Sequence, residues 1–452
     1  MPREHLLKIG VSGVRGVVPE FLTPSLALHF AQAFGTYVGR GRVVVGRDTR
    51  MSGPMLQHAV NCGLLAAGCD VVDVGILPTP TIQIYVEHIR ARGGIGLTAS
   101  HNPPEYNALK LFNKEGQFFN QYERNELIDL YHQSDFTQAS NAEIGHVRID
   151  QGTAKAVHIN RVLAKVDVER IRRRHFRVAL DAVNGAGSVM TPGFLVDSLG
   201  CRLDAISIDP TKVFPRIAEP RPDTLGELSE LVRRTGAEVG FAQDPDADRL
   251  AIADETGRVL DNDDVLALAV LHALAVVPGD VVVNLTTSSA IDDIALGFGR
   301  RVYRTPVGEA NVVETMQAVK AAIGGEGSAG GVIFPAVQLC RDSFTAMAFL
   351  LDLMANSGKT VSELVAALPQ YVRKSGKVAF EHGRLGGLMQ TLEEGFPEAE
   401  ADRTDGLKLI WPDRWLHVRA SNTEPLLRLF VEAKTAGAAE KLYDTAWKLL
   451  AG

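Results

Sequence analysis

The stretch RVVVGRDTR, residues 42–50, decides the fold prediction, because an apolar, β-branched strand runs there into a polar loop. A helical stretch follows it, and AAGCDVVDVG then turns at a glycine into a second strand. The same order returns at FRVALDAVNGAG (176–187) and at DVVVNLTTSS (280–289). Strand, loop, helix, glycine and strand make a βαβ signature, which predicts a mainly parallel, buried sheet. Three such units in tandem favour a divergent internal triplication.

The last part of the chain breaks this pattern. The segments KVAFEHGRLGGLMQTLEEGF, LKLIWPDRWLHVRAS and LLRLFVEA give alternating strands and helices, which predicts a smaller α+β domain. The fold class that we expect is therefore α/β, with three tandem mixed-sheet α/β domains and a smaller C-terminal α+β domain around a central cleft. The predicted domains cover residues 1–150, 151–255, 256–370 and 371–452.

The composition is that of an ordinary globular chain and argues against several classes of partner. Of 452 residues, 46% are hydrophobic and 22% charged, and the net charge of -7 leaves no basic footprint for nucleic acid. The longest apolar run, residues 265–277, is shorter than the roughly 20 residues that span a bilayer, so it predicts a buried helix. The N-terminus lacks an apolar signal region, and Cys62, Cys69, Cys201 and Cys340 show no CxxC spacing. We expect a cytoplasmic protein with buried thiols and with no nucleic-acid or membrane partner.

The strongest chemical signal is VGFAQDPDADRLAIAD (239–254), in which two apolar strands enclose an acidic loop. Asp244, Asp246 and Asp248 lie two residues apart, and alternate residues of extended backbone share one face, so their carboxylates can converge. Converging carboxylates repel one another unless a cation neutralises them, and hard oxygen donors suit Mg²⁺ better than zinc. A solvated acidic turn is the alternative. The adjacent Arg249 could bind an anion or pair with the aspartates.

A serine stands at the end of another predicted strand, in LTASHNPPEYNALK (97–110). Ser100 could be a nucleophile, a phosphate site, a metal ligand or a turn residue. TASHN does not match the G-x-S-x-G elbow of a serine hydrolase, and no base oriented by an aspartate can be named. A phosphorylated serine beside a Mg²⁺ site fits better, because the metal would neutralise the phosphoryl oxygens.

Three weaker motifs could bind an anion or a sugar. The segment 418–433, VRASNTEPLLRLFVEA, offers hydroxyls and a guanidinium for a phosphate cradle, although by itself it is better explained as an ordinary Ser/Thr turn. The glycine-rich IGGEGSAGGVIFP (323–335) contains Glu326, which could accept hydrogen bonds from sugar hydroxyls, and a plain linker is the alternative. In IGVSGVRGVV (9–18), Arg15 becomes interesting only if a phosphate lies near it.

Taken together, TASHNP, DPDADR, GEGSAGG and RASNTEP occur in the order found in the α-D-phosphohexomutases, and the chain resembles that family over essentially its whole length. The family includes phosphoglucomutase, phosphomannomutase and phosphoglucosamine mutase. The resemblance implies an intramolecular phosphotransferase, a phosphomutase of the isomerase class, that uses Mg²⁺ and a hexose 1,6-bisphosphate activator. It also implies a small sugar phosphate as the partner, and it leaves a homodimer open.

The resemblance implies roles for individual residues. Phosphorylated Ser100 would carry the phosphoryl group and would bind Mg²⁺ together with the three aspartates. Lys110 would serve general acid–base catalysis, for which we expect burial and neighbours to tune its pKa downward. The other implied positions are His101, Arg249 and Arg15 around the transferring phosphoryl group, Glu326 and Ser328 in the sugar-binding loop, and Arg419, Ser421, Asn422 and Thr423 in the loop that binds the non-transferred phosphate.

In the implied mechanism, Ser100 gives its phosphoryl group to a sugar phosphate, the bound bisphosphate reorients, and the other phosphate returns to Ser100. Closure of the C-terminal domain would exclude water. The chain departs from the common family pattern at GVSGVRG, at Ala108 and at Ser328-Ala329-Gly330, where many members have SGH. These departures leave glucosamine, mannose and glucose phosphates open as substrates. A catalytically idle sugar-phosphate-binding homologue and a Mg²⁺-dependent sugar phosphatase are the alternatives.

Overall fold

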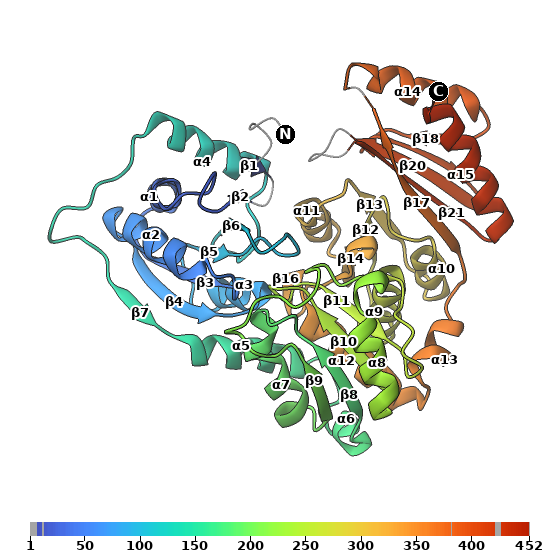
Figure 1. Ribbon diagram of the computed structural model, residues 1–452, viewed down its shortest axis with the longest axis horizontal. Helices are drawn as coiled ribbons and strands as arrows, with labels where there is room; N and C mark the ends of the chain where they lie inside the picture. Colours follow the sequence, from blue (N-terminus) through green and yellow to red (C-terminus); the bar gives the residue numbers. More distant parts are fainter. Residues whose placement is uncertain (1–6, 11–12, 381, 421–425, 452) are drawn as a thin grey trace.

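The computed structural model describes residues 7–10, 13–380, 382–420 and 426–451, which form four domains in chain order (Figure 1). Each of the first three domains contains the same four-stranded core sheet. Its first strand lies between the second and the third, all three parallel, and the fourth strand runs antiparallel beside the third. The predicted α/β fold class is confirmed, and the shared strand order is what an internal triplication would leave.

Domain I carries the first copy of the core sheet, in the order β6-β5-β3-β4, with β2 and β1 added at one edge and β7 at the other. Its strands are β1 (Leu7–Gly10), β2 (Gly13–Val17), β3 (Arg42–Arg47), β4 (Asp70–Ile76), β5 (Gly93–Leu97), β6 (Tyr106–Phe112) and β7 (Val147–Ile149). Its helices are α1 (Pro24–Val38), α2 (Gly53–Ala66), α3 (Thr79–His88) and α4 (Gln121–Gln133).

Domain II repeats the core sheet in the order β11-β10-β8-β9. Its elements are α5 (Gln151–Leu163), α6 (Val168–Arg174), β8 (Arg177–Asp181), α7 (Thr191–Gly193), β9 (Arg202–Ile206), α8 (Gly226–Thr235), β10 (Val239–Gln243) and β11 (Leu250–Ala253). The crossover after β8 is not the regular helix that the repeat pattern predicts, since the three-residue α7 is followed by a π-helical turn over Phe194–Ser198. Glycines precede it because the chain passes close to the acidic loop, where a Cβ on Gly185 would lie 2.6 Å from Pro245 Cα.

Domain III repeats the sheet in the order β13-β12-β14-β15 and adds β16 beside β15. Its elements are α9 (Asn262–Val276), β12 (Val281–Asn284), α10 (Ala290–Gly297), β13 (Val302–Thr305), α11 (Glu309–Val319), β14 (Ile323–Glu326), β15 (Gly331–Phe334), β16 (Gln338–Arg341), α12 (Ser343–Ser357) and α13 (Val361–Ala366). The buried helix predicted at 265–277 is α9, which begins after Asp261 because that side chain accepts a hydrogen bond from the Asp263 N–H. Among the described residues, no helix is long and apolar enough to cross a bilayer.

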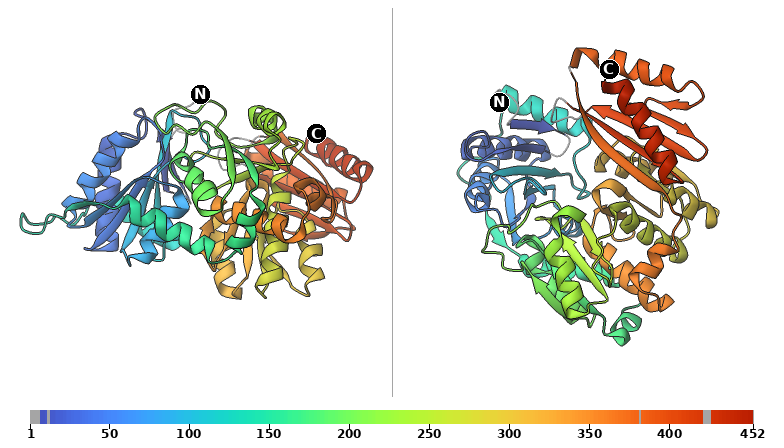
Figure 2. Two further views of the ribbon diagram at one scale, coloured as in Figure 1. Left: turned by 90° about the horizontal axis from the view of Figure 1, so that it is seen from below. Right: turned by 45° about the vertical axis from the view of Figure 1, so that its right-hand side comes forward.

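Domain IV is the predicted smaller α+β domain, with an antiparallel sheet in the order β17-β21-β20-β19-β18. It adjoins domain III (Figure 2), where Lys408 Nζ donates to Leu285 O at 2.7 Å and the Ser289 N–H donates to Glu432 Oε1 at 2.8 Å. Its elements are β17 (Val372–Ala379), α14 (Leu385–Gly395), β18 (Glu400–Asp402), β19 (Leu407–Trp411), β20 (Arg414–Ala420), β21 (Leu426–Ala433) and α15 (Ala436–Ala451).

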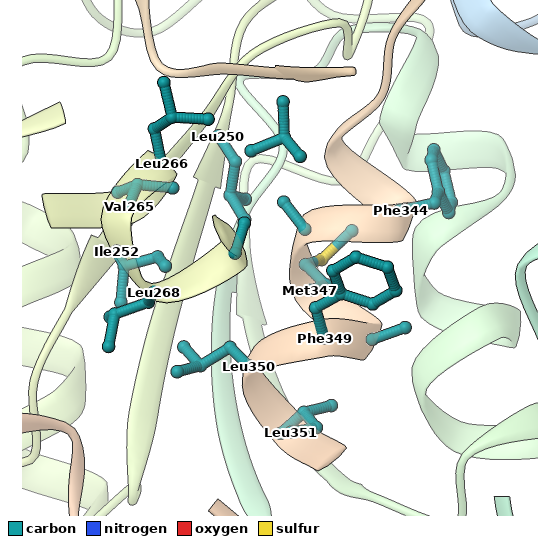
Figure 3. Close-up of a cluster of buried hydrophobic side chains, with 14 of the residues drawn as sticks. Leu250, Ile252, Val265, Leu266, Leu268, Phe344, Met347, Phe349, Leu350 and Leu351 are labelled. Carbon is teal, nitrogen blue, oxygen red and sulfur yellow. The ribbon is translucent and has the colours of Figure 1, made fainter. Parts of the chain in front are cut away.

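The apolar core does not follow the domain boundaries. One continuous cluster of buried side chains runs through domains II and III and takes in Ile84 of domain I, whereas domains I and IV each also have a cluster of their own. Figure 3 shows part of the shared cluster, in which Met347 and Phe349 of α12 lie near side chains of β11 and α9. Phe344 is on the other side of α12, where its ring contacts those of Phe194 and His158. Domains II and III therefore stabilise each other by burying apolar surface that neither would bury alone.

The three chemical motifs occupy the same place in the three core sheets. Each is the loop between the third and fourth strands, namely 98–105 in domain I, 244–249 in domain II and 327–330 in domain III. These loops leave the carboxyl end of a parallel strand, which is where open α/β sheets commonly bind ligands. The triplication thus supplies three equivalent loops, each with different side chains.

Candidate active site

Ser100 joins the loops of domains I and II. It is 3% exposed, and its φ of 48° lies in the left-handed region, which is unusual for a residue other than glycine. Its hydroxyl donates a hydrogen bond to Asp244 Oδ2 at 2.7 Å, across 144 positions of sequence. The serine that the sequence singles out therefore lies directly against the acidic loop.

The three aspartates converge, as predicted, although not by the predicted route. Asp244, Asp246 and Asp248 are all buried, and each offers an oxygen within 4.8 Å of the others. The loop is a tight turn and not extended backbone, since the Ala247 N–H donates to Asp244 O and Ala247 has a φ of 53°. Period-two alternation is therefore the wrong explanation, and the turn itself brings the carboxylates together.

These carboxylates fit a divalent cation. Asp246 Oδ1 and Asp248 Oδ1 are buried without a hydrogen-bond partner, which is costly unless another ligand satisfies them. Burial and the neighbouring carboxylates of Asp246 and Asp248 raise the pKa of Asp244 well above its ordinary value. A bound Mg²⁺ would remove both penalties, because hard carboxylate oxygens are its preferred protein ligands.

Lys110 lies among the aspartates at the end of a buried side chain. Its Nζ is 2.5 Å from Asp246 Oδ2 and 3.3 Å from Asp248 Oδ2. Burial would lower the pKa of Lys110, but these two carboxylates raise it above the ordinary value. The expected downward tuning is therefore wrong for this structure, because the amine is ion-paired with the acidic loop.

The other residues expected around the phosphoryl group are two arginines and a neutral histidine. The Arg249 N–H donates to Asp244 Oδ1 at 3.2 Å, and Arg15 Nη1 donates to Asn102 Oδ1 at 2.6 Å in the Ser100 loop. Arg249, burial and Arg15 lower the pKa of His101 to about 2, so the imidazole is neutral near physiological pH. This surrounding suits an anion held next to Ser100.

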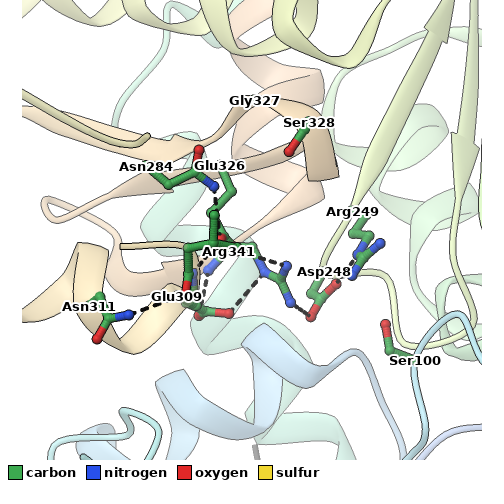
Figure 4. A network of polar contacts seen from close by, with 12 residues as sticks. Ser100, Asp248, Arg249, Asn284, Glu309, Asn311, Glu326, Gly327, Ser328 and Arg341 are labelled. Carbon is green, nitrogen blue, oxygen red and sulfur yellow. Dashed lines mark hydrogen bonds and ion pairs between the residues drawn. The ribbon is translucent and has the colours of Figure 1, made fainter. Parts of the chain in front are cut away.

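Arg341, which the sequence does not single out, connects the acidic loop with domain III (Figure 4). Its guanidinium lies 2.8 Å from Asp248 Oδ2 and 2.9 Å from Glu309 Oε2. Its third partner is Glu326, at 3.4 Å. The only signal for Arg341 in the sequence is its place at the end of a strand, and its partners are distant in sequence.

Thr79 is a second functional residue that the sequence does not single out, and its hydroxyl donates to Asp246 Oδ2 at 2.6 Å.

Glu326 is held by the protein rather than left free for a ligand. Its Oε1 accepts hydrogen bonds from Asn284 Nδ2 at 3.1 Å and from the Gly308 N–H at 2.9 Å, while Arg341 approaches Oε2. Ser328 is exposed, and its hydroxyl lies 3.1 Å from that of Thr286. Of the two sugar-loop candidates, Ser328 is the more accessible.

The expected phosphate-binding loop is described only at its start. Arg419 Nε lies 3.2 Å from Asp405 Oδ2, within domain IV. The Val307 N–H of domain III donates to the same Asp405 oxygen at 3.0 Å. Ser421, Asn422 and Thr423 lie outside the described residues.

Comparison with known proteins agrees with this geometry along the whole chain. The phosphoglucomutase/phosphomannomutase models for α/β/α domains I, II and III match residues 6–138, 156–257 and 261–372, and the C-terminal domain model matches 358–446. A phosphoglucomutase/phosphomannomutase of Thermococcus kodakarensis is 41% identical over 449 residues, covering 98% of each chain. The chain belongs to this family. As a family member, the protein is a phosphomutase, an enzyme of the isomerase class.

Two further relatives of the phosphomutase show how far its likeness extends. A probable phosphoglucosamine mutase of Methanopyrus kandleri is 38% identical, covering 96% of each chain. The crystal structure of a phosphoglucomutase/phosphomannomutase family protein from Burkholderia thailandensis superposes with a TM-score of 0.85 at 26% identity, covering 98% of this chain and 96% of the other. The four-domain organisation is thus that of the family, while the boundaries at 150, 255 and 370 remain predictions.

Proposed function

We propose that the phosphomutase interconverts hexose 6-phosphates and hexose 1-phosphates through phosphorylated Ser100 and a bound hexose 1,6-bisphosphate. The observation that carries this proposal is the 2.7 Å hydrogen bond from the Ser100 hydroxyl to Asp244, in a loop whose buried carboxylates fit Mg²⁺. Asp244, Asp246 and Asp248 would hold the ion together with the Ser100 phosphate. The bound ion would neutralise charge on the phosphoryl oxygens.

The proposed transfer is balanced within the protein and its substrate. The sugar hydroxyl oxygen forms a bond to phosphorus while the bond from phosphorus to Ser100 Oγ breaks. In net terms the hydroxyl proton passes to Ser100 Oγ. The Lys110 ammonium is the candidate acid that protonates the departing Oγ, after which its amine takes the hydroxyl proton. Arg15 and Arg249 would hold the phosphoryl oxygens, and neutral His101 would lie beside them. Reorientation of the bisphosphate and the reverse transfer complete the cycle.

The remaining part of the substrate would lie toward domains III and IV. We propose that Ser328, with Glu326 behind it, contacts the sugar hydroxyls. Arg419 would bind the non-transferred phosphate together with Ser421, Asn422 and Thr423. The ion pair from Arg419 to Asp405 supports this role, because it fixes the direction of the guanidinium before an anion arrives. The hexose bisphosphate activator, the cytoplasmic location and a homodimer remain predictions.

A substrate panel tests the proposed function. The protein is incubated with Mg²⁺, a trace of glucose 1,6-bisphosphate, and glucose 1-phosphate, mannose 1-phosphate or glucosamine 6-phosphate in turn. The names of the relatives include all three activities, so isomerisation of at least one substrate is expected. Free phosphate should not accumulate, since a mutase conserves the phosphoester. Absence of turnover with all three substrates, although Ser100 is phosphorylated, would overturn the proposal, and steady phosphate release would favour a phosphatase.

The role of the 327–330 loop can be tested at its first glycine. A Cβ on Gly327 would lie 2.0 Å from Asp263 Oδ1 and 3.0 Å from Thr287 Cγ2, so Gly327→Ala must displace the loop. We expect KM for the sugar phosphate to rise about tenfold while the Mg²⁺ requirement is unchanged. The matched control is Gly297→Ala, because a Cβ at that position in α10 meets no atom within 4 Å. An unchanged KM for Gly327→Ala would contradict a sugar-binding role for this loop.

A further inference from the structure

Arg50, the last residue of the RVVVGRDTR stretch, uses its whole guanidinium to hold the Ser100 loop. Nη2 donates to the carbonyl oxygens of Ser100 at 2.6 Å and Asn102 at 2.7 Å. Nη1 donates to those of Pro103 at 2.5 Å and Tyr106 at 2.9 Å. The fifth N–H, on Nε, is bound by a carboxylate, so all five donors are engaged. The side chain is fully buried and has no donor left for a substrate.

That carboxylate, Asp48, ties down both peptide groups of Ser100. Asp48 Oδ2 accepts from Arg50 Nε at 3.0 Å and from the Thr98 hydroxyl at 2.6 Å. The Thr98 oxygen in turn accepts from the Ser100 N–H at 3.0 Å. The Ser100 N–H is therefore fixed through Thr98, and its carbonyl is fixed through Arg50. Left-handed φ is costly for serine, and such a conformation persists only where its surroundings enforce it.

A related arrangement lies at the start of the acidic loop of domain II. Arg216 Nε donates to Asp181 Oδ2 at 2.6 Å, and Asp181 ends β8 just as Asp48 follows β3. Arg216 Nη2 donates to Gln243 O at 2.9 Å, where the acidic loop begins. In both domains, a carboxylate at or directly after the end of the first strand therefore orients an arginine. Arg50 binds carbonyls within the loop after the third strand, and Arg216 binds the last residue of the third strand.

We propose that Arg50, oriented by Asp48, is the positioning residue that holds Ser100 in the conformation from which its Oγ meets Asp244. The proposal rests on the proposed function, since it assumes that Ser100 carries the phosphoryl group. Arg50 acts on the reaction only through the loop. Its loss should therefore lower the rate of phosphoryl transfer and leave binding of the sugar phosphate almost unchanged.

The test compares wild type with Arg50→Lys, which keeps the charge but cannot reach four carbonyl oxygens. We expect kcat to fall about 100-fold, because a misplacement of about 1 Å costs that much, with KM within about threefold of wild type. Hydrogen exchange of the backbone amides in residues 98–106 should accelerate as the loop is released. The control is Arg170→Lys, which weakens an ion pair with Asp352 at 2.8 Å elsewhere and should leave kcat unchanged.

Each outcome decides a separate question. Unchanged kcat together with unchanged exchange at 98–106 would overturn the positioning role, and so would a lower melting temperature with wild-type kcat, since that is only a structural effect. If Arg50→Lys does not fold, Thr98→Val removes the bond from the Ser100 N–H and the bond to Asp48 while Arg50 stays in place, and it should lower kcat about tenfold at constant KM. A wild type that turns over no sugar phosphate would instead refute the proposed function. The exchange measurement would still report whether Arg50 holds the loop.

Discussion

Ser100→Ala is expected to abolish turnover of every sugar phosphate, by at least about 1,000-fold, while the fold is retained. Alanine has no oxygen to carry the phosphoryl group, so no binding energy elsewhere can restore the transfer. The stability cost should be about 1 kcal/mol, because the variant loses a single hydrogen bond to Asp244. The measurements are the rate of isomerisation with saturating Mg²⁺, the intact mass before and after exposure to glucose 1,6-bisphosphate, and the melting temperature.

Ser207→Ala is the matched control for Ser100→Ala. Ser207 also has a left-handed backbone, with a φ of 53°, and it directly follows β9 in domain II. Both substitutions therefore replace a left-handed serine by alanine, but only one removes the proposed phosphoryl carrier. Ser207→Ala should keep wild-type activity and should still gain the mass of one phosphoryl group. Full activity in Ser100→Ala would show that the phosphoserine assignment is wrong.

Asp246→Asn is expected to weaken Mg²⁺ binding at least about 100-fold, since even partners in the outer shell of a metal site cost 10–100-fold. It should also destabilise the fold, because Asp246 takes hydrogen bonds from Thr79 and Lys110. Breaking a buried ion pair costs about 3–5 kcal/mol, and the remaining contact of Lys110 with Asp248 should reduce that loss. The measurements are the Mg²⁺ concentration for half-maximal activity and the urea midpoint of unfolding.

A second substitution separates the two effects of Asp246→Asn. Lys110→Met in the Asp246→Asn background removes the buried cation that has lost its closer carboxylate, so the double variant should regain stability without regaining Mg²⁺ affinity. Asp254→Asn is the control, because Asp254 is a buried carboxylate just after β11 whose partners are Thr256 and Arg258. It should lower stability with an unchanged Mg²⁺ requirement. A wild-type Mg²⁺ requirement in Asp246→Asn would contradict the metal site.

The repeated fold was predictable because its signal is local. The β-branched stretch at 42–50 and its two later counterparts mark parallel strands, and the structure contains three sheets with one strand order. The crossover after β8 was not predictable, since the glycines there serve a close approach to Pro245, which is distant in sequence. Local patterns therefore reveal the repeat, but not the places where a distant contact alters it.

The residues of the candidate site also differ in whether local sequence or a distant contact determines them. The aspartates could be grouped from sequence because they lie within five residues of one another, although the turn at Ala247 was missed. Arg341 could not be found, because Asp248 is brought to it only by the packing of domain II against domain III, and Glu309 only by the fold of domain III. The direction of the Lys110 pKa was also wrong, since it depends on how close the amine comes to the carboxylates.

The apolar cluster shared by domains II and III bears on how the three repeats could have evolved. Domain I and domain IV each enclose a core, so each could have been exchanged or inserted as a module. Domains II and III could not, since separating them would leave the apolar face of α12 in water. Exchanging domain II or domain III alone is therefore expected to give a protein that does not fold. A substitution on one side of the boundary between these two domains must be compensated by a substitution on the other side. The acidic loop belongs to domain II and Arg341 to domain III, so their ion pair crosses this boundary. The residues at the boundary are therefore constrained both by the proposed catalysis and by folding.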